Sequence, residues 1–296
     1  MVKSFRLRHN FLLFTFCFLL FTSFAQQQNL PLNKENSLWV ERHLNHKENN
    51  SHTGLKPYLT SQIQLDSLVR EEQKRDSVKT YQSLILRKIK NENLLIIDTG
   101  GFYLTIDPLF NFEYDYVLPS DTLNYYRNTR GLLVRANIGK KVSLMSSFYE
   151  NQAFFPSYQD EFVNTYGVVP GKGRTKPFKQ RGYDYAMASG FVSFTPFKQL
   201  SFQLGHNKHF IGDGYRSLLL SDNAFNYPFL KITTNLWKNR IQYSNIFASL
   251  QSLDRVLEST TPEATFQRKA GTFHYLSINA AKWLQIGLFE GTVWQR

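Results

Sequence analysis

The chain has 296 residues and a net charge of +12, from 35 Lys and Arg against 23 Asp and Glu. Its single cysteine excludes a disulfide framework within the chain. The positive charge suits an acidic partner, such as nucleic acid, an acidic polysaccharide or lipid headgroups.

The N-terminus has the features of a cleaved signal peptide covering residues 1–25. Basic residues precede an apolar run at 11–21, and Ser23 and Ala25 supply the small residues of a cleavage site. The run is shorter than the about 20 apolar residues that span a bilayer, which argues against a membrane anchor. Cleavage would remove Cys17 and three basic residues, which lowers the net charge from +12 to +9. Export makes polysaccharide or lipid, and not nucleic acid, the expected partner.

Two segments precede the predicted strands. Residues 26–60 are polar and rich in Asn, Lys, Glu and His, which predicts a linker. Residues 61–90 carry apolar side chains at helical spacing, with neither Gly nor Pro, and predict one or two amphipathic helices. We therefore expect a helical segment at 61–99, either in the periplasm or as a plug.

From residue 100 onward the apolar period changes to two. Apolar Leu132, Val134 and Ala136 occupy every second position of one stretch. In another stretch, apolar Phe202 and Leu204 stand on either side of polar Gln203. Such alternation predicts β-strands with one apolar face. Nine strands are expected, at about 101–112, 130–138, 142–150, 185–194, 199–208, 228–236, 240–249, 272–280 and 283–292.

Short and long connections alternate strictly between these strands. The connection at 139–141 is short, for example, and the next one, at 151–184, is long. This asymmetry is typical of an all-β transmembrane antiparallel barrel with periplasmic turns and extracellular loops. Trp237 and Trp283 lie at short turns beside lysines, as in the interfacial belts of membrane proteins. A secreted β-sandwich with uneven loops is the alternative.

The predicted barrel region, 100–296, is incomplete. Bacterial single-chain barrels have an even number of strands, whereas nine are counted here, and the last one ends on the side of the long loops. The chain also lacks the terminal aromatic residue typical of such barrels. We therefore expect the sequence to be the N-terminal part of a longer protein.

The alternation also assigns faces. Gln203 and Asn207 belong to the polar face, where an introduced charge should be tolerated. A charge on the other face should cost roughly 2–4 kcal/mol at mid-membrane depth. That apolar surface is expected to contain Leu132, Val134, Phe202, Leu204, Leu284 and Ile286.

The stretch HFIGDGYRSLLLSDNAFNYPFLKI at 209–232 covers a predicted extracellular or lumen-lining loop and the strand after it. It lacks the strand–turn–helix setting of a dinucleotide-binding loop and has no G-x-S-x-G nucleophile elbow. Gly212 and Gly214 are expected to permit a tight bend. Arg216 and Asp222 either pair within the loop or help to bind a sugar. The candidate sugar contacts are Tyr215, Arg216, Asp222 and Asn223.

The long loop at 151–184 carries a basic cluster between glycines and aromatic residues. Lys172 and Arg174 are its candidate ligand-binding residues, because an acidic glycan or a lipopolysaccharide phosphate would meet positive charge there. A solvated loop without a ligand is the alternative.

Residues typical of catalysis or metal binding do not form a recognisable set. His206 and His209 would point to opposite faces of a strand, which is poor geometry for a shared metal. Glu150, Asp160 and Glu161 could be glycosidase carboxylates, but nothing places two of them at the required separation. No catalytic residue, metal or cofactor is predicted.

Five long segments of the chain have distinctive sequences. They are FYLTIDPLFNFE (102–113), NTRGLLVRANIGKKVSLMSSFYENQAFFPSY (128–158), VVPGKGR (168–174), GYDYAMASGFVSF (182–194) and FIGDGYRSLLLSDNAFNYPFLKI (210–232). In these segments the chain closely resembles the RemB-like gliding-motility outer-membrane proteins of Bacteroidetes, and the likeness covers about residues 57–250. GDGYRSLLLSDNA is also similar, more distantly, to capsule-assembly proteins of the Wzi type.

The resemblance implies a non-enzymatic outer-membrane β-barrel that acts at the cell surface. In the RemB-like group that role is gliding motility, with surface polysaccharide or adhesin and gliding-machinery proteins as expected partners. In the Wzi-type group it is binding and surface attachment of capsular polysaccharide, which is the alternative. Neither group supplies a catalytic residue.

Overall fold

A computed structural model gives the structure of the chain. It describes residues 28–30, 32, 40–41, 44, 50–60, 62–63, 83–90, 92–116, 125–256 and 266–295. The predicted signal peptide and most of the predicted helical segment lie outside these residues. Within the latter, the described part contains helix α4 (Leu84–Lys90) and, instead of further helix, strand β2 (Leu95–Asp98). Among the described residues, no helix is both long and apolar enough to cross a membrane.

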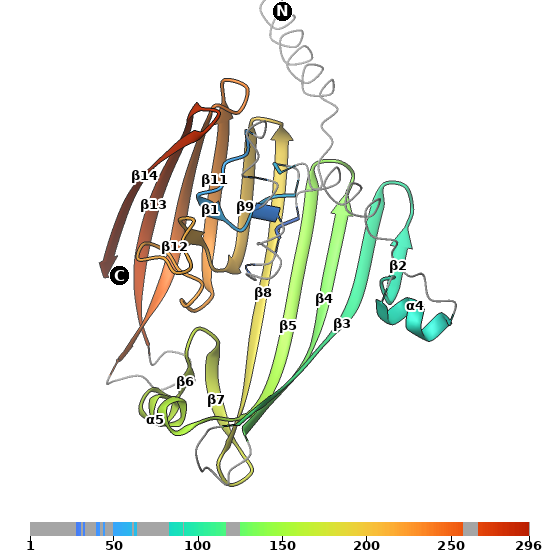
Figure 1. Cartoon of the computed structure of the whole chain (residues 1–296), viewed down its shortest axis with the longest axis vertical. Helices are drawn as coiled ribbons and strands as arrows, with labels where there is room; N and C mark the ends of the chain where they lie inside the picture. Colours follow the sequence, from blue (N-terminus) through green and yellow to red (C-terminus); the bar gives the residue numbers. More distant parts are fainter. Residues whose placement is uncertain are drawn as a thin grey trace, which may run out of the picture.

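One antiparallel sheet of 12 strands forms the body of the molecule (Figure 1). Ten of its strands pair in chain order as a meander, which confirms the predicted all-β class. In the described residues β2 and β14 are the two ends of the strand order, so closure into a barrel stays a prediction. After β2 the meander contains β3 (Phe102–Asp115), β4 (Tyr125–Ile138), β5 (Val142–Phe154), β8 (Gly182–Phe197), β9 (Leu200–Asn207), β11 (Tyr227–Leu236), β12 (Ile241–Arg255), β13 (Phe266–Ala281) and β14 (Leu284–Gln295).

The remaining elements lie in the long connections. Helix α5 (Ser157–Tyr166) and the hairpin of β6 (Val168–Val169) and β7 (Gly173–Phe178) follow β5. Strand β7 pairs with the first residues of β8, beyond the end of β9. Strand β10 (Phe210–Ile211) lies between β9 and β11 and pairs with β1 (Leu55–Lys56) in a separate two-stranded sheet.

All nine predicted strands are present, and several are longer than predicted at the long-loop end. Strand β4 begins at Tyr125 instead of about residue 130, and β5 continues to Phe154. These added residues are aromatic and polar, so they lack the aliphatic alternation that predicts a strand. Tyr126 and Phe154 face each other across the pair, with ring centroids 5.0 Å apart. Aromatic cross-strand pairs of this kind stabilise the extension.

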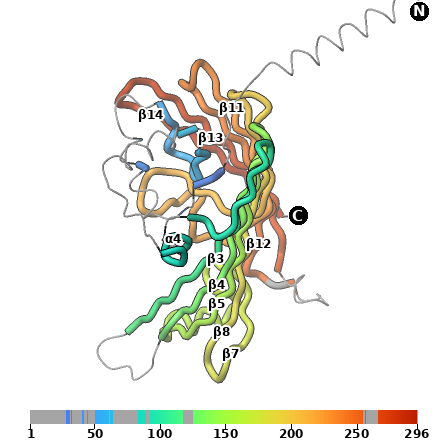
Figure 2. Tube along the Cα trace, turned by 90° about the vertical axis from the view of Figure 1, so that its right-hand side faces the viewer, coloured from blue at the N-terminus to red at the C-terminus, as the bar shows by residue number. Residues whose placement is uncertain are grey.

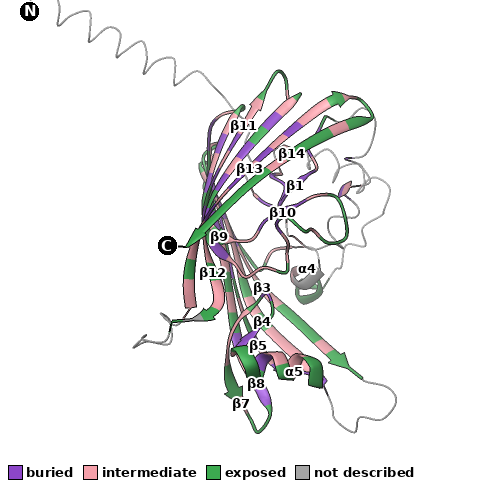
Figure 3. Cartoon of the chain, turned by 90° about the vertical axis from the view of Figure 1, so that its left-hand side faces the viewer, coloured by how far each residue is buried: buried purple, intermediate pink, exposed green. Residues whose placement is uncertain are grey.

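Residues 50–60, here called the N-terminal segment, and the loop at 208–226 pack against one face of the large sheet, which we call the covered face. Figure 3 shows β1 and β10 on this side, and Figure 2 shows the blue strand β1 beside the same face. Leu55 of β1, Ile211 of β10 and Leu220 join a buried apolar cluster with Phe229 and Phe273 of the sheet. The predicted polar linker, 26–60, therefore does not describe residues 50–60, which are packed on the sheet.

The covered face is polar near the short turns. Gln203 is 0% exposed, and its Nε2 donates to Asn29 Oδ1 at 3.0 Å. Gln28 Nε2 lies 3.2 Å from Asn137 Oδ1, and Asn50 O accepts from Asn279 Nδ2 at 2.9 Å. The prediction that a charge is tolerated at Gln203 is wrong, because this polar side chain is fully enclosed. Other buried polar residues of the face are Ser143, Ser193, Ser201, Lys231, Thr233, Gln242, Ser244 and Ser277.

The opposite face of the sheet, here called the exposed face, is mainly apolar. Leu204 is 65% exposed, while Val134 and Phe202 are half-buried by their neighbours on this same face. The apolar surface is interrupted across β12 to β14 by Asn245, His274 and Glu290, which are aligned by strand register. Exposed apolar residues of the face include Leu132, Phe148, Val192, Phe194, Leu230, Phe247, Leu284, Ile286 and Leu288.

Candidate functional site

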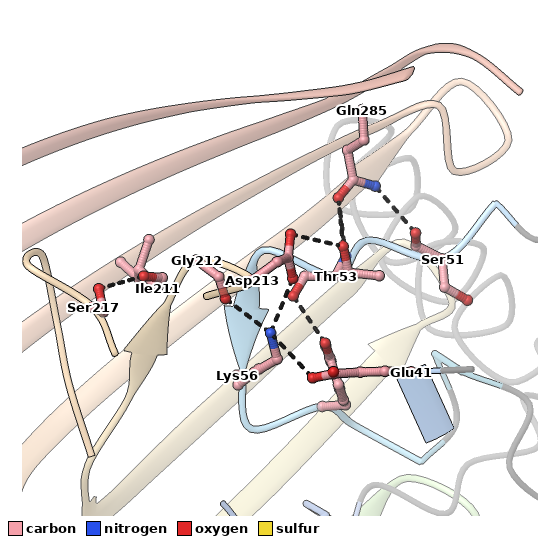
Figure 4. Close-up of polar contacts among 10 residues, drawn as sticks. Glu41, Ser51, Thr53, Lys56, Ile211, Gly212, Asp213, Ser217 and Gln285 are labelled. Atoms are coloured by element: carbon pink, nitrogen blue, oxygen red, sulfur yellow. Dashed lines mark hydrogen bonds and ion pairs between the residues drawn. The ribbon is translucent and has the colours of Figure 1, made fainter. Parts of the chain in front are cut away.

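The G-D-G sequence at 212–214 fixes the loop at 208–226 to the N-terminal segment. Gly212 has φ +120°, a conformation that L residues rarely adopt, and its N–H donates to Gly54 O at 2.7 Å. The Ser217 hydroxyl donates to Ile211 O and closes the turn (Figure 4). The bend predicted for Gly212 and Gly214 is therefore seen at Gly212, where it continues the β1–β10 pairing, whereas Gly214 is not among the glycines with positive φ.

Asp213 supplies the charged part of this junction. Lys56 Nζ lies 3.0 Å from Asp213 Oδ1 and 2.8 Å from Gly212 O, although Lys56 itself is buried (Figure 4). Thr53 Oγ1 lies 3.3 Å from Asp213 Oδ2 and 3.0 Å from Gln285 Oε1 of β14. These contacts join the N-terminal segment, the loop and the sheet, so Asp213 has a structural role that sequence alone did not predict.

The four predicted sugar contacts of the loop come together. Arg216 Nη1 lies 3.2 Å from Asn223 Oδ1 and 3.6 Å from Asp222 Oδ2, so the pairing within the loop is present. The Arg216 guanidinium also lies 4.8 Å from the ring centroid of Tyr215, which is 72% exposed. An exposed aromatic face beside a guanidinium and an amide can stack on a sugar and bind its hydroxyls. Gly214 lies between Asp213 and this cluster.

The V-V-P-G-K-G-R sequence at 168–174 forms the β6–β7 hairpin, whose turn packs on the loop at 208–226. Gly171 has φ +65°, and a Cβ there would lie 2.9 Å from Asn223 O. Lys208 Nζ donates to Gly171 O at 2.8 Å and to Asp222 O at 3.0 Å. Lys208 therefore bridges the two loops, a role that no sequence motif indicated.

The two lysines of this region share a desolvated environment. Burial and, to a smaller extent, the charge of Lys172 lower the pKa of Lys208 to about 8, and Asp222 opposes the shift. Desolvation also lowers the pKa of Lys172, helped by Arg127 and opposed by Glu113. An anion bound here would favour the charged form of both lysines.

A cavity of about 180 Å³ lies next to the hairpin, in the wall of the sheet. Pairing between β9 and β11 stops at Asn207 and Tyr227, whereas β8 and β12 continue past this point. The wall is therefore interrupted between β8 and β12 at the long-loop end. We call this space the wall cavity; its lining includes Lys172, Arg174, His206, Asn226, Gln251 and Phe266.

Arg174 spans the interruption. Its guanidinium carbon lies 4.9 Å from the ring centroid of Phe266 on β13. His206 Nδ1 is 3.3 Å from Ala188 O, and Asn226 Nδ2 donates to the same oxygen at 2.8 Å. The two predicted basic residues, Lys172 and Arg174, thus line one cavity, and Tyr215 is not among the described residues of its lining.

The other titratable candidates are occupied by structural contacts. His209 is buried with Nδ1 3.0 Å from Tyr227 Oη, and burial lowers its pKa well below the usual value. Glu150 forms an ion pair with Arg130, and Asp160 accepts from Tyr183 Oη at 2.6 Å. Within the described residues, no group of three or more His, Cys, Asp or Glu side chains could hold a metal ion.

Comparison with known proteins does not identify this arrangement. No protein-family model, curated protein or solved structure matches the chain. The chemistry of the two faces and of the long-loop end is therefore the basis for the proposed function.

Proposed function

We propose that the chain forms wall strands of an outer-membrane β-barrel that acts, without catalysis, in gliding motility and cell-surface organisation. Its long loops would contact surface polysaccharide or an adhesin. One observation carries the membrane part of the proposal: the exposed face of the sheet is apolar and the covered face is polar near the turns. A water-soluble sheet has the opposite distribution, because burial of apolar surface drives its packing.

Aromatic residues at both ends of the exposed face support this membrane placement. Trp237 and Trp283 are 75% and 78% exposed at the short turns. At the other end, Phe112 and Tyr126 begin a row of neighbouring rings, and Trp294 lies on β14. From Trp283 to Trp294 a strand rises about 36 Å at about 3.3 Å per residue. At the 35–45° tilt of membrane strands this gives a height of roughly 26–30 Å, close to the apolar band of known barrels.

The long-loop end supports a role in contacting acidic glycans. It carries the exposed Tyr215 and Arg216 as well as Lys172, Arg174 and Lys208 in or beside the wall cavity. Positive charge next to aromatic rings suits an acidic polysaccharide. Gliding motility itself enters from the family resemblance of the sequence.

Retention of capsular polysaccharide is the second candidate function. The same loop cluster favours it, because the segment from Gly212 to Ala224 is the one with the Wzi-type likeness. The two functions differ in their cellular result: loss of the first stops colony spreading, and loss of the second releases capsule.

Single-cysteine labelling tests the membrane placement. Cys17 is the only cysteine of the chain, so the protein without its predicted signal peptide offers a background free of thiols. In intact cells, a membrane-impermeant maleimide should label Tyr215→Cys, on a long loop. It should label Lys198→Cys, on a short turn, only after the outer membrane is opened. Equal labelling of both positions in intact cells would contradict the proposal.

Deletion and complementation test the function. We expect the deletion strain to lose colony spreading and the unaltered gene to restore it. A gene with Tyr215→Ala and Arg216→Gln should restore it only in part, whereas Lys198→Gln should restore it fully. Normal spreading with capsule released into the medium would favour the second function, and no change in either property would overturn both.

A further inference from the structure

We propose that the wall cavity binds one carboxylate-bearing sugar ring, of the hexuronate type, within an acidic polysaccharide. This inference rests on the proposed contact with surface glycans and assigns it a site and a ligand class. The site is separate from the exposed cluster of Tyr215 and Arg216, because neither residue lines the cavity.

The charge of the lining selects an anion. Lys172 and Arg174 contribute to it, and among the described residues that line the cavity there is no Asp or Glu. Lys208 lies close enough to Lys172 that the positive charge of Lys172 lowers the pKa of the Lys208 ammonium. A guanidinium matches the two oxygens of a carboxylate in a planar, bidentate pair, which assigns this role to Arg174.

The uncharged part of the lining selects a sugar over a bare inorganic anion. Asn226 and Gln251 provide amide groups, and Ser252 provides a hydroxyl, all of which can bind sugar hydroxyls. Phe225 and Phe266 add aromatic surface against which the C–H face of a sugar ring can pack. Inorganic phosphate would form ion pairs with the cationic side chains but would not contact the aromatic surface as a sugar ring would.

The size of the cavity limits the ligand to a small unit. Its volume of about 180 Å³ is below the range of roughly 300–1,000 Å³ of sites for drug-sized ligands. A single ring at the end of a branch therefore fits this space, whereas a run of several sugar residues does not. The rest of the polymer would remain outside the sheet, at the long-loop end.

Two glycines keep the cationic turn in place before a ligand arrives. Gly171 has φ +65° and lies against Asn223 O, and a Cβ on Gly173 would lie 2.8 Å from Ala186 O. Larger residues at either position would push the hairpin away from the loop or from β8. The G-K-G-R sequence thus holds Lys172 and Arg174 at the cavity, which reduces the ordering cost of binding.

The test is calorimetric titration of the full chain in lipid vesicles with glucuronate, with glucose as the neutral control and inorganic phosphate as the competing anion. We expect glucuronate to bind, and glucose and phosphate to bind at least about tenfold more weakly. Glucose lacks the carboxylate that would pair with the cations, and phosphate lacks the sugar ring and its hydroxyls. Arg174→Gln should weaken glucuronate binding by about tenfold or more, and Lys172→Gln should also weaken it. Lys198→Gln, which makes the same charge change on an exposed short turn, should not.

Several results would overturn this inference. They are equal binding of glucose, equal or tighter binding of phosphate, and unchanged affinity in Arg174→Gln and Lys172→Gln. Circular dichroism would check that each variant is folded. Arg174→Lys keeps the positive charge but loses the two-pronged guanidinium, so it should bind glucuronate with intermediate affinity.

A parallel assay separates this inference from the function on which it rests. Vesicles with the protein are mixed with an acidic, uronate-containing polysaccharide and sedimented. If the polymer binds but glucuronate does not compete, the cavity assignment is wrong while the surface-glycan function stands. If the polymer is not retained by the unaltered protein, the glycan contact itself is wrong.

Discussion

The covered and exposed faces of the sheet share the same strands yet differ in chemistry near the short turns, where the covered face is polar and the exposed face is apolar. On β9, Gln203 is fully enclosed and bound to Asn29, while the next residue, Leu204, is 65% exposed. In water this arrangement would leave apolar side chains solvated, and so lose about 25 cal/mol of stabilisation for each Å² of apolar surface that is not buried. It would also remove polar groups from water, which costs desolvation free energy. The proposed membrane placement would account for this difference, because lipid and not water would then border the exposed face.

The largest effect is expected from a charge on the exposed face. Leu204→Arg should lower the free energy of unfolding in lipid vesicles by about 2–4 kcal/mol, because the guanidinium would enter hydrocarbon. Leu218→Arg, at a fully exposed loop position, should change it by less than about 0.5 kcal/mol. Reversible unfolding in urea measures both. Equal, small effects would mean that water borders the exposed face.

A smaller effect is expected from removal of a hydrogen bond on the covered face. Gln203→Leu leaves Asn29 Oδ1 without its 3.0 Å donor, which should cost about 1–3 kcal/mol. The double variant Asn29→Leu with Gln203→Leu should recover part of this loss, because both polar partners are then absent. The same unfolding assay gives the coupling energy, and strictly additive effects would show that the two side chains do not interact.

The smallest effect concerns pH and the docking of residues 50–56. His52 Nδ1 is 2.8 Å from Ser277 Oγ and Nε2 is 3.0 Å from Asn239 O, and burial lowers the pKa of His52. Docking of residues 50–56 on the sheet favours the neutral His52 ring. The contribution of His52 to the stability of the docked state is therefore complete above pH 6.5, and it is lost as the pH falls below 6.5 through the lowered pKa.

Hydrogen exchange of the amides at 50–56 checks this pH dependence. We expect less protection at pH 5 than at pH 7.5 after correction for intrinsic exchange. His52→Gln keeps a donor and an acceptor but does not titrate, so it should show a smaller difference between the two pH values. An equal difference in the variant would assign the effect to another group.

The sequence was a good guide to the sheet where aliphatic alternation was regular. All nine expected strands are present. In stretches such as Leu132 to Ile138 and Leu284 to Leu288, apolar residues occur at every second position, and only an extended strand places all of them on one face. It was a poor guide to the strand ends near the long loops, where rings such as Phe112 and Tyr126 pair only across strands. Local pattern contains no information about such partners.

The sequence indicated which residues are candidates for the site, but it did not indicate which of them the fold brings together. Tyr215, Arg216, Asp222 and Asn223 lie within one loop, so proximity in sequence brought them together. Lys172 and Arg174 instead join residues of β9, β12 and β13 around the wall cavity. Lys56 and Lys208 were missed, because their partners are distant in sequence or are backbone oxygens with no residue signature.

The sequence by itself determined the period of two, the alternation of short and long connections, and which residues of each strand share a face. These properties depend on neighbouring residues and on the geometry of an extended chain. Only the tertiary structure decided which face is covered. Residues 50–60 and the loop at 208–226 both pack on the covered face, through hydrogen bonds such as His52 to Ser277 and through the apolar cluster that includes Leu55, Ile211 and Leu220. A polar segment that reads as a linker becomes part of the interior because the polar face offers it partners, while the apolar face offers none.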